Sequence, residues 1–579
     1  MAEGTRMGWR HAWREGAGAR MAAGTRLGCG EDTPLEAGGP DGPVIVRDVE
    51  GLRADVVEED GVGVMLRDDT RLEARVFRPA AEGTYPVIMA FTAYGKHITP
   101  DEYPAAVTYG ELPGFDPGTF EVSPWTAWEA PDPATWVPLG YAVVFVDVRG
   151  YHAAEGEASL LSAQDGADFY DVIEWAGAQP WSDGNVALMG VSYLAISQWV
   201  AAGESPPSLR AVVPWEGQTD SFREVIFHGG VPETAFTSFW LDRLRNQANI
   251  PAIPTVALLQ TLQIQGVEAY RTTAPVQSIA LERVTVPALI CATWSDHGLH
   301  SRGSFEAYKQ IRSEEKWLFT HGRQKWAVFY SDEALAMQRQ FLDHFLKGED
   351  TGIEDVGRVR LEVRESLETF TVRYEDDWPI PRTEYRALYL DAATGALSAD
   401  LPETEEETRY LPLTEGATFT LTFDEDTELT GNMKLRLRGS TSDGTDMDLF
   451  VGIVKLDASG EGVTFFGKAG FAEHPVALGW LRASERALDE ARSTPAQPWL
   501  SHENPQPLAP GEIVPVDIEI LPSSTLFRAG ETLRVRVQGA DLFEHPTLGH
   551  DFSDDVNVGE HTIHTGGEHD SHLLVPVVP

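Results

Sequence analysis

Short, continuous apolar runs alternate with helix-like stretches between residues 87 and 346. Such runs are typical of strands that are buried on both faces of a parallel sheet, because no polar positions interrupt them. The apolar runs are 87–91, 142–146, 186–189, 211–213, 288–292 and 317–319, and the helix-like stretches are 163–178, 193–202, 304–312 and 332–346. This alternation predicts a doubly wound α/β core.

Two regions depart from the alternation. Residues 217–285 are helix-rich, are broken by Pro251 and Pro254, and separate two core strands; this predicts a helical cap over the strand ends. Beyond residue 351, short β-like runs are separated by Gly, Asp and Thr, which predicts an all-β sandwich or jelly roll. The expected organisation is a flexible leader (1–40), an α/β core in two parts (41–216 and 286–350), the cap (217–285) and a β domain (351–579).

The chain is long and strongly acidic. It has 579 residues, with 45 Lys and Arg against 90 Asp and Glu and a net charge of −45. Its 42% hydrophobic and 23% charged residues are typical of a globular protein, and its length allows about three domains. Two acids for each base would repel phosphate backbones and anionic lipid headgroups, so we expect neither a nucleic-acid nor a membrane partner.

The cysteines and the N-terminal segment bear on the compartment. The chain has only Cys29 and Cys291, the first in a Gly-rich leader and the second in an apolar run, so we expect no disulfide. No apolar run approaches the ~20 residues that span a bilayer. The N-terminal arginines are not followed by an apolar segment, so the leader does not fit a signal peptide. We therefore expect a cytoplasmic protein.

The run 186–189 leads into Gly190-Val191-Ser192, and the helix-like stretch 193–202 follows at once. A serine on a tight turn between a strand and a helix forms a nucleophile elbow, which holds its hydroxyl at the carboxyl end of the sheet. The helix N-terminus then offers backbone N–H groups to a developing oxyanion. Leu194 stands where the motif has its second small residue. The pattern predicts Ser192 as a nucleophile.

An elbow serine needs a base, and the base needs an orienting carboxylate, in the chain order Ser, Asp, His for this fold. After Ser192, two further core runs end in polar residues, the first followed by Asp296 and the second by His321. These residues therefore follow successive strands at the edge where the fold places an acid and a base. His297 and His300 are rival bases that come one strand earlier.

Two other clusters have some features of metal sites. Five histidines lie near the C-terminus, namely His550, His561, His564, His569 and His572. They include a His-x-x-His spacing, but the stretch has no cysteine and lies in the predicted β domain, away from the elbow. Residues 443–448 are rich in aspartate but lack the glycine at the sixth position and the distal glutamate of an EF-hand loop. We expect no metal and no organic cofactor.

Several motifs along the chain match one family in order. They are Ala93-Tyr94-Gly95, Asp147-Val148-Arg149-Gly150, Gly190-Val191-Ser192-Tyr193, Trp294-Ser295-Asp296, His321-Gly322 and Phe345-Leu346-Lys347-Gly348. Together they resemble the cocaine-esterase/X-prolyl dipeptidyl peptidase superfamily (CocE/NonD hydrolases), over about residues 45–579. The resemblance implies an α/β-hydrolase core with a helical cap insertion and a C-terminal all-β jelly-roll domain.

The resemblance also implies roles for single residues. Ser192 would be the nucleophile, Asp296 the orienting acid and His321 the general base. The oxyanion hole would be made by the backbone N–H of Tyr193 and the phenol hydroxyl of Tyr94, since a tyrosine hydroxyl is a short donor that suits charge developing in a transition state.

No sequence motif identifies the residues of the substrate pocket. Trp215 and Phe222 lie at the edge of the predicted cap, and we name them as candidates for substrate binding. In the amino-acid ester hydrolases of the superfamily, carboxylates that bind an ammonium follow the catalytic aspartate; this chain has His297, Gly298 and Leu299 there. Neutral acyl substrates are therefore expected.

The expected activity is hydrolysis of an ester or amide through an acyl-enzyme, on a small molecule or a short peptide. An X-Pro dipeptidyl-peptidase is the second interpretation, although that branch carries a folded N-terminal domain where we expect only a leader. A catalytically silent binding protein that uses the β domain is a third, from another class; the set Ser192, Asp296 and His321 argues against it. The sequence does not indicate an oligomeric state.

Overall fold

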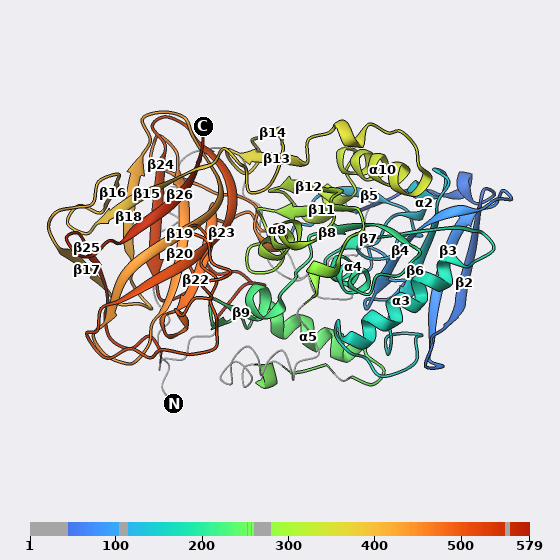
Figure 1. Cartoon of the computed structure of the whole chain (residues 1–579), viewed down its shortest axis with the longest axis horizontal. Helices are drawn as coiled ribbons and strands as arrows, with labels where there is room; N and C mark the ends of the chain where they lie inside the picture. The colour runs from blue at the N-terminus through green and yellow to red at the C-terminus, as the bar shows by residue number, and fades with distance from the viewer. Residues whose placement is uncertain (1–43, 104–113, 252, 256, 260–278, 551–555) are drawn as a thin grey trace, which may run out of the picture.

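The computed structural model describes residues 44–103, 114–251, 253–255, 257–259, 279–550 and 556–579. The predicted leader, 1–40, lies outside the described residues. Figure 1 shows a β-rich C-terminal part beside an α/β part that extends from β2 to β14 along the chain. In the described ranges, no helix is both long enough and apolar enough to cross a membrane.

One sheet organises the α/β part. Its ladders run in the order β2–β3–β6–β4–β7–β8–β11–β12–β13–β14 in the described chain. Pairing is parallel from β6 to β13 and antiparallel at both edges. The bounds are β2 (Val56–Met65), β3 (Arg71–Pro79), β4 (Tyr85–Thr92), β6 (Ala142–Asp147), β7 (Ser182–Val191), β8 (Leu209–Trp215), β11 (Ala288–Thr293), β12 (Lys316–His321), β13 (Val359–Arg364) and β14 (Phe370–Glu375). The predicted α/β alternation is confirmed.

Helices between the strands cover the sheet. Every residue of β6 and of β11 is buried, as the continuous apolar runs predict. The helices are α2 (Pro133–Trp136), α3 (Ala163–Gly177), α4 (Tyr193–Gly203), α8 (Ser301–Gln310), α9 (Lys325–Phe329) and α10 (Asp332–Lys347). A capping box at Ser162 and Asp165 starts α3, and a left-handed Gly348 ends α10.

The predicted cap occupies the connection between β8 and β11. Its described elements are the π-helix η3 (Phe222–Ile226), β9 (Phe227–His228), β10 (Val231–Pro232), α5 (Phe236–Gln247) and the 3-10 helix η4 (Leu281–Arg283); residues 252, 256 and 260–278 of this region are outside the described ranges. The insertion contacts the β domain, because Arg482 N–H donates to the carbonyl of Gly229 and Glu233 forms an isolated bridge with His550.

The C-terminal domain consists of strands that enclose one apolar core. β15, β26, β19 and β23 form one layer, to which β17 and β25 add, and β18, β24, β20 and β22 form the other. The bounds are β15 (Glu384–Asp391), β16 (Ala396–Ser398), β17 (Glu406–Tyr410), β18 (Ala417–Thr422), β19 (Thr427–Thr441), β20 (Asp448–Leu456), β21 (Gly462–Val463), β22 (Ala477–Arg482), β23 (Val514–Phe527), β24 (Thr532–Gln538), β25 (His561–Thr565) and β26 (His572–Val578). Leu435, Ile518 and Val535 are fully buried between the layers.

The junction of the two parts differs in detail from the expected boundary at residue 351. β13 and β14 follow that residue, yet they extend the α/β sheet rather than the β domain. Arg364, at the end of β13, pairs in register with Thr525 of β23, and its guanidinium donates to Ser523 Oγ and to the carbonyl of Val476. The two parts therefore share a buried polar contact.

Candidate active site

Ser192 lies on the tight turn between β7 and α4. Its backbone has φ 58° and ψ −117°, a conformation that few non-glycine residues adopt and that is frequent at functional sites. The turn needs Gly190, because a Cβ there would lie 2.6 Å from the Cβ of Leu194. Leu194 thus packs where the motif has a small residue, and Gly190 makes the room. Ser192 N–H donates to the carbonyl of Trp215 at 3.0 Å, which ties the turn to β8.

A histidine and a carboxylate from one loop face Ser192. His300 Nε2 lies 3.3 Å from Ser192 Oγ, and His300 Nδ1 lies 2.5 Å from Asp296 Oδ2. Backbone bonds from Leu299 and His300 to the carbonyl of Asp296 coil this segment into a helical turn. Residues four apart on such a turn share a face, so the loop after β11 supplies both the histidine and the carboxylate that face Ser192.

The hydrogen positions follow from the partners. A carboxylate only accepts, so His300 Nδ1 carries the hydrogen toward Asp296, and Nε2 of the neutral ring can accept from the Ser192 hydroxyl. Burial and the nearby Lys325 ammonium lower the pKa of His300, which keeps the ring neutral near pH 7. The ring is therefore set to receive a proton from Ser192.

Lys325 completes this buried group. Its Nζ lies 2.6 Å from Asp296 Oδ2 and 3.1 Å from His300 Nδ1. Burial alone would raise the pKa of Asp296, but Lys325 and His300 hold that pKa far below its usual range. Burial would lower the pKa of Lys325, but Asp296 and Glu216 raise it. The pair thus stays ionised inside the protein.

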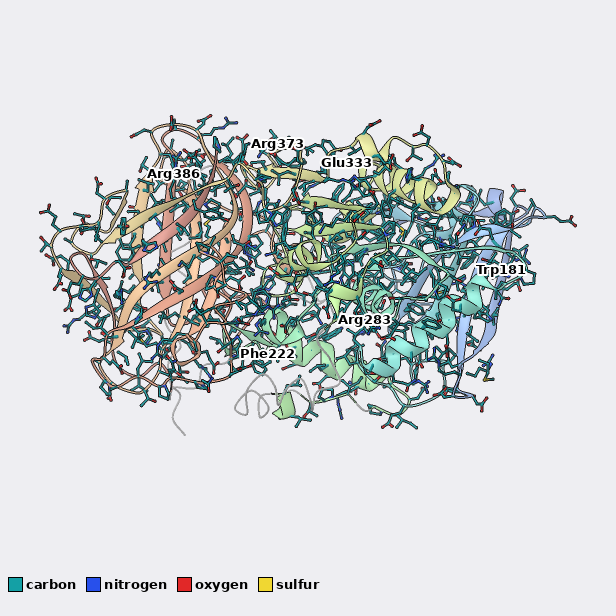
Figure 2. All side chains as sticks on the ribbon, viewed as in Figure 1. Trp181, Phe222, Arg283, Glu333, Arg373 and Arg386 are labelled. Atoms are coloured by element: carbon teal, nitrogen blue, oxygen red, sulfur yellow. The ribbon has the colours of Figure 1, made fainter. Side chains whose placement is uncertain are left out.

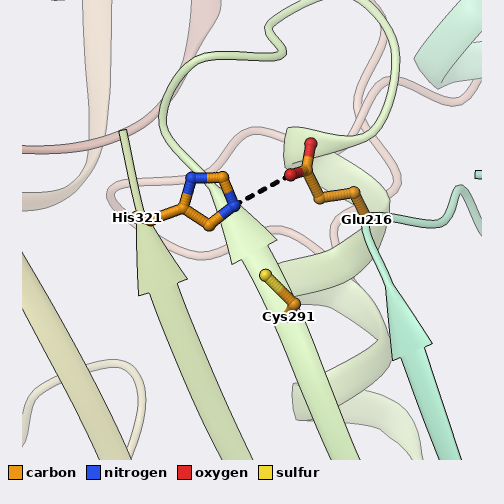
Figure 3. Close-up of side chains that lie close together, drawn as sticks. All are labelled: Glu216, Cys291 and His321. Carbon is orange, nitrogen blue, oxygen red and sulfur yellow. Dashed lines mark ion pairs between the residues drawn. The ribbon is translucent and has the colours of Figure 1, made fainter. Parts of the chain in front are cut away.

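The structure does not bring His321 to Ser192. Figure 3 shows its ring directed at Glu216, with Cys291 beside them. His321 Nδ1 accepts from the Arg323 N–H at 3.2 Å, so Nε2 carries the hydrogen of the neutral ring. Nε2 lies 2.9 Å from Glu216 Oε1, although their alignment is poor for a hydrogen bond. Burial lowers the pKa of His321 to about 3. Both ring nitrogens face other partners, which is why the residue expected as the base is not placed as one.

The two residues that could make an oxyanion hole lie beside the nucleophile. Tyr94 lines the same cavity as Ser192, and its hydroxyl accepts from Trp240 Nε1 at 3.2 Å. Tyr193 begins α4, so its N–H lies at the helix N-terminus, where backbone donors have no partner within the helix. The two rings pack edge to face with centroids 5.8 Å apart.

Aromatic side chains of the cap line the cavity at Ser192. Phe236, Phe239 and Trp240 come from α5, Trp128 and Trp326 come from the core, and Lys468 and Ala469 come from the β domain. The cavity is thus built by all three regions of the chain. The sequence did not identify these residues; the amphipathic spacing of Phe236 and Trp240 on a predicted cap helix was the available signal.

The two residues expected to bind substrate lie elsewhere. Trp215 is fully buried in the core, where its ring packs against Phe319 and Phe329. Phe222, labelled in Figure 2, lies where the insertion meets the β domain and packs against Phe227 and His502. Neither lines the cavity of Ser192. Both are large aromatics that the fold uses to close its own interfaces.

Two groups of side chains have metal-ligand chemistry in the described residues: Glu216, Cys291 and His321, and Glu216, Asp296 and His300. The first does not suit a cation, because the His321 nitrogen that faces Glu216 carries its hydrogen. The second already holds the Lys325 ammonium. In the C-terminal histidine cluster, His550 is bonded to His228 and Asp541, and His564 is bonded to Ser440, so these histidines have structural partners.

Two family models and several known proteins match this chain. The family model described as X-Pro dipeptidyl-peptidase (S15 family) matches residues 68–324, and that of the X-Pro dipeptidyl-peptidase C-terminal non-catalytic domain matches residues 351–574. A cocaine esterase from Rhodococcus sp. (strain MB1 Bresler) is 26% identical over 89% of this chain and 98% of its own. An α-amino acid ester hydrolase, at 18% identity and a TM-score of 0.66 over 90% of this chain and 97% of its own, shares the fold.

A solved CocE/NonD family hydrolase from Staphylococcus aureus is similar over almost the whole length. It is 39% identical, with a TM-score of 0.85, over 94% of this chain and 100% of its own. Identity at this level over a complete relative, together with the two matching family models, shows the family. The chain belongs to the CocE/NonD family and is a hydrolase of the serine esterase and dipeptidyl-peptidase type.

Proposed function

We propose that this hydrolase cleaves ester or amide bonds through Ser192, His300 and Asp296, with an acyl-enzyme intermediate. The observation that carries the proposal is the continuous contact from Ser192 Oγ to His300 Nε2 at 3.3 Å and from His300 Nδ1 to Asp296 Oδ2 at 2.5 Å. Nucleophile, base and orienting carboxylate in contact are the signature of an activated serine. His300 replaces His321, which the sequence favoured, as the base.

The steps follow from the atoms. Ser192 Oγ attacks the substrate carbonyl while His300 Nε2 takes its proton, and Asp296 stabilises the imidazolium that forms. The carbonyl oxygen becomes an oxyanion, for which the Tyr193 N–H and the Tyr94 hydroxyl are the proposed donors. His300 then protonates the leaving group, and water, activated by the same ring, releases the acyl group from Ser192.

His321 has a supporting role in this proposal. It faces Glu216, whose carboxylate also lies 3.9 Å from Lys325 Nζ. Burial raises the pKa of Glu216 to about 8. Because Glu216 contacts His321 on one side and lies near Lys325 on the other, the His321–Glu216 contact helps to hold the Lys325–Asp296 pair in place.

We infer an ester or amide of a small molecule as the substrate, a jelly-roll topology for the β domain, and a cytoplasmic location without nucleic-acid or membrane partners. An X-Pro dipeptidyl-peptidase remains the second candidate, because the catalytic family model that matches residues 68–324 carries that description.

A substrate panel on the purified full chain tests the proposal. 4-Nitrophenyl esters should be turned over, Ser192→Ala should lower kcat by about 10⁴-fold or more, and a fluorophosphonate probe should label the parent but not the variant. Faster release of nitroaniline from Gly-Pro-4-nitroanilide than of nitrophenol from every ester would favour the peptidase. Equal turnover by the parent and Ser192→Ala would refute the assignment.

A further inference from the structure

A lysine of the β domain reaches the cavity of the proposed nucleophile. Lys468 begins the short 3-10 helix η6 (Lys468–Gly470) between β21 and β22, and it lines the same cavity as Ser192 although only 2% of its surface is exposed. The next residue, Ala469, also lines the cavity and has a left-handed backbone with φ 58°. Such strain in a non-glycine residue persists only where the surroundings impose it.

The α/β core fixes this loop in place. Gly470 lies so close to the core that a Cβ would be 1.7 Å from the backbone oxygen of Asp116, and Asp116 N–H donates to the carbonyl of Ala469 at 3.5 Å. The position of Lys468 is thus determined by contacts on both sides of the domain junction. A charge held this way is preorganised for a ligand.

The ammonium of Lys468 has few partners for a buried cation. Its Nζ donates to the carbonyl of Thr547 at 2.8 Å and lies 4.7 Å from the centre of the Phe236 ring. Among the described residues it forms no ion pair with a carboxylate. An ammonium has three donors. Burial lowers the pKa of the Lys468 ammonium, even though Glu233, Asp296 and Asp541 act on it electrostatically, so a further anion in contact with it would be stabilising. The site therefore has capacity for an anion.

The other ionisable groups of the cavity do not supply that anion. The charge of Lys325 is matched by Asp296, 2.6 Å away. Burial raises the pKa of Glu129 to about 8, so this carboxyl is mainly protonated at pH 7, and its Oε1 accepts from Trp326 Nε1. Among the described residues that line the cavity, Lys468 is thus the cation that no carboxylate contacts, even though the whole chain carries −45. Exposed charges are screened beyond about 8 Å at physiological ionic strength, so the local cation governs binding.

We propose that Lys468 binds a carboxylate group of the substrate, so that the enzyme prefers esters or amides that carry a negative charge near the scissile bond. The inference rests on the proposed function, because it names the substrate class of the same site. This differs from the expectation of neutral substrates, which was drawn only from the residues that follow Asp296. Lys468 belongs to the β domain, far from them in the sequence.

Matched ester pairs test the charge preference on the parent protein. Mono-4-nitrophenyl adipate carries an anion on the acyl side, and 4-nitrophenyl hexanoate is its neutral match; 4-carboxyphenyl acetate and phenyl acetate form the pair for the leaving group. We expect kcat/KM to favour the anionic member of one pair by about 10-fold or more, mainly through KM, and the favoured pair identifies which side of the ester faces Lys468.

Variants then assign the preference to the residue. Lys468→Met should abolish the preference and Lys468→Arg should retain part of it. Lys455→Met is the matched control, because Lys455 is also a buried lysine of the β domain near an aromatic ring, but it is paired with Glu531 away from the cavity; it should retain the preference.

The outcomes separate this inference from the function. Equal kcat/KM for both members of each pair in the parent, or an unchanged preference in Lys468→Met, would overturn the anion site and leave the hydrolase intact. Failure to turn over any ester or amide, without labelling of Ser192, would overturn the proposed function instead. The ratio in the parent protein is informative even if the variants fold poorly.

Discussion

Lys325 Nζ lies 2.6 Å from Asp296 Oδ2, the oxygen that also accepts from His300 Nδ1. The carboxylate therefore holds two groups at once, a permanent cation and the proposed base. A cation this close opposes a second positive charge on His300 and so lowers the pKa of its ring. No local sequence pattern predicts this arrangement, because Lys325 begins a separate helix, α9, that follows β12, whereas Asp296 follows β11.

Removal of the Lys325 charge should change the pH dependence of the reaction. In Lys325→Gln the imidazolium of His300 is no longer opposed by a cation, so the pKa of His300 rises. Since the base works in its neutral form, the acidic limb of the kcat/KM profile should move to higher pH, by about 1 unit. A pH series with a 4-nitrophenyl ester measures the shift.

Lys347→Gln is the control, because it removes the same kind of 2.6 Å Lys–Asp contact, with Asp343 on α10. It should leave the acidic limb in place. A limb that stays or moves to lower pH in Lys325→Gln would contradict the proposed effect.

The two candidate bases can be told apart by the same substitution at each. His300→Gln should lower kcat by about 10³-fold or more, because glutamine cannot take the Ser192 proton. His321→Gln should lower kcat by no more than about 10-fold, since both ring nitrogens of His321 face groups other than Ser192. Steady-state kinetics of both variants, with thermal unfolding to check the fold, provides the comparison. A larger loss in His321→Gln than in His300→Gln would return the role to the residue that the sequence favoured.

In the proposed oxyanion hole, Tyr94 donates through its side chain and Tyr193 through its backbone N–H. Tyr94→Phe removes a side-chain donor and should lower kcat by about 10²-fold or more with little change in KM, because the lost bond forms only in the transition state. Tyr193→Phe should have little effect, since its proposed donor is the backbone N–H and its buried hydroxyl has no partner in the described structure. Similar losses in the two variants would argue that the Tyr94 hydroxyl is not a donor to the oxyanion.

The sequence predicted the elements of the site that depend on strand order. The elbow at Ser192 and the carboxylate at Asp296 follow from apolar runs that end in polar residues, and the structure places both at the carboxyl edge of the parallel sheet. The same rule selected His321, which does follow β12. Strand order predicts which residues follow each strand, however, and not the conformation of the loops that direct their side chains.

The structure places His300 rather than His321 against Ser192, because the loop after β11 folds into a helical turn. Asp296 and His300 are four residues apart, a spacing that puts side chains on one face of a helix, and this was the signal that could have identified His300. Helical spacing could have drawn attention to Trp240, but it could not place Trp240 or Lys468 in the pocket, because these residues come from the cap and from the β domain. Their positions depend on how three regions pack, which no local pattern in the sequence contains.

The buried carboxyl of Glu216, behind the site, should make the free energy of unfolding depend on pH. Glu216 is fully buried, and burial raises its pKa to about 8 from 4.5. A carboxyl whose pKa is higher in the folded state favours folding most below its unfolded pKa, and this contribution is lost as the pH rises through about 8. The free energy of unfolding should therefore decrease between pH 5 and pH 8. In Glu216→Gln, which has no such proton, the decrease should be smaller by up to about 1.4 kcal/mol per pH unit.

Denaturant unfolding of the parent and the variant at several pH values between 5 and 8 measures this slope. Burial also raises the pKa values of Glu129 and Glu224, to about 8 and about 7, so the variant should retain part of the slope. Glu384→Gln is the control, because Glu384 lies at the surface in an exposed pair with Arg386, and its slope should equal that of the parent. If Glu216→Gln keeps the full slope of the parent, Glu216 is ionised in the folded protein across this range, and the Lys325 ammonium, 3.9 Å away, outweighs the effect of burial on its pKa.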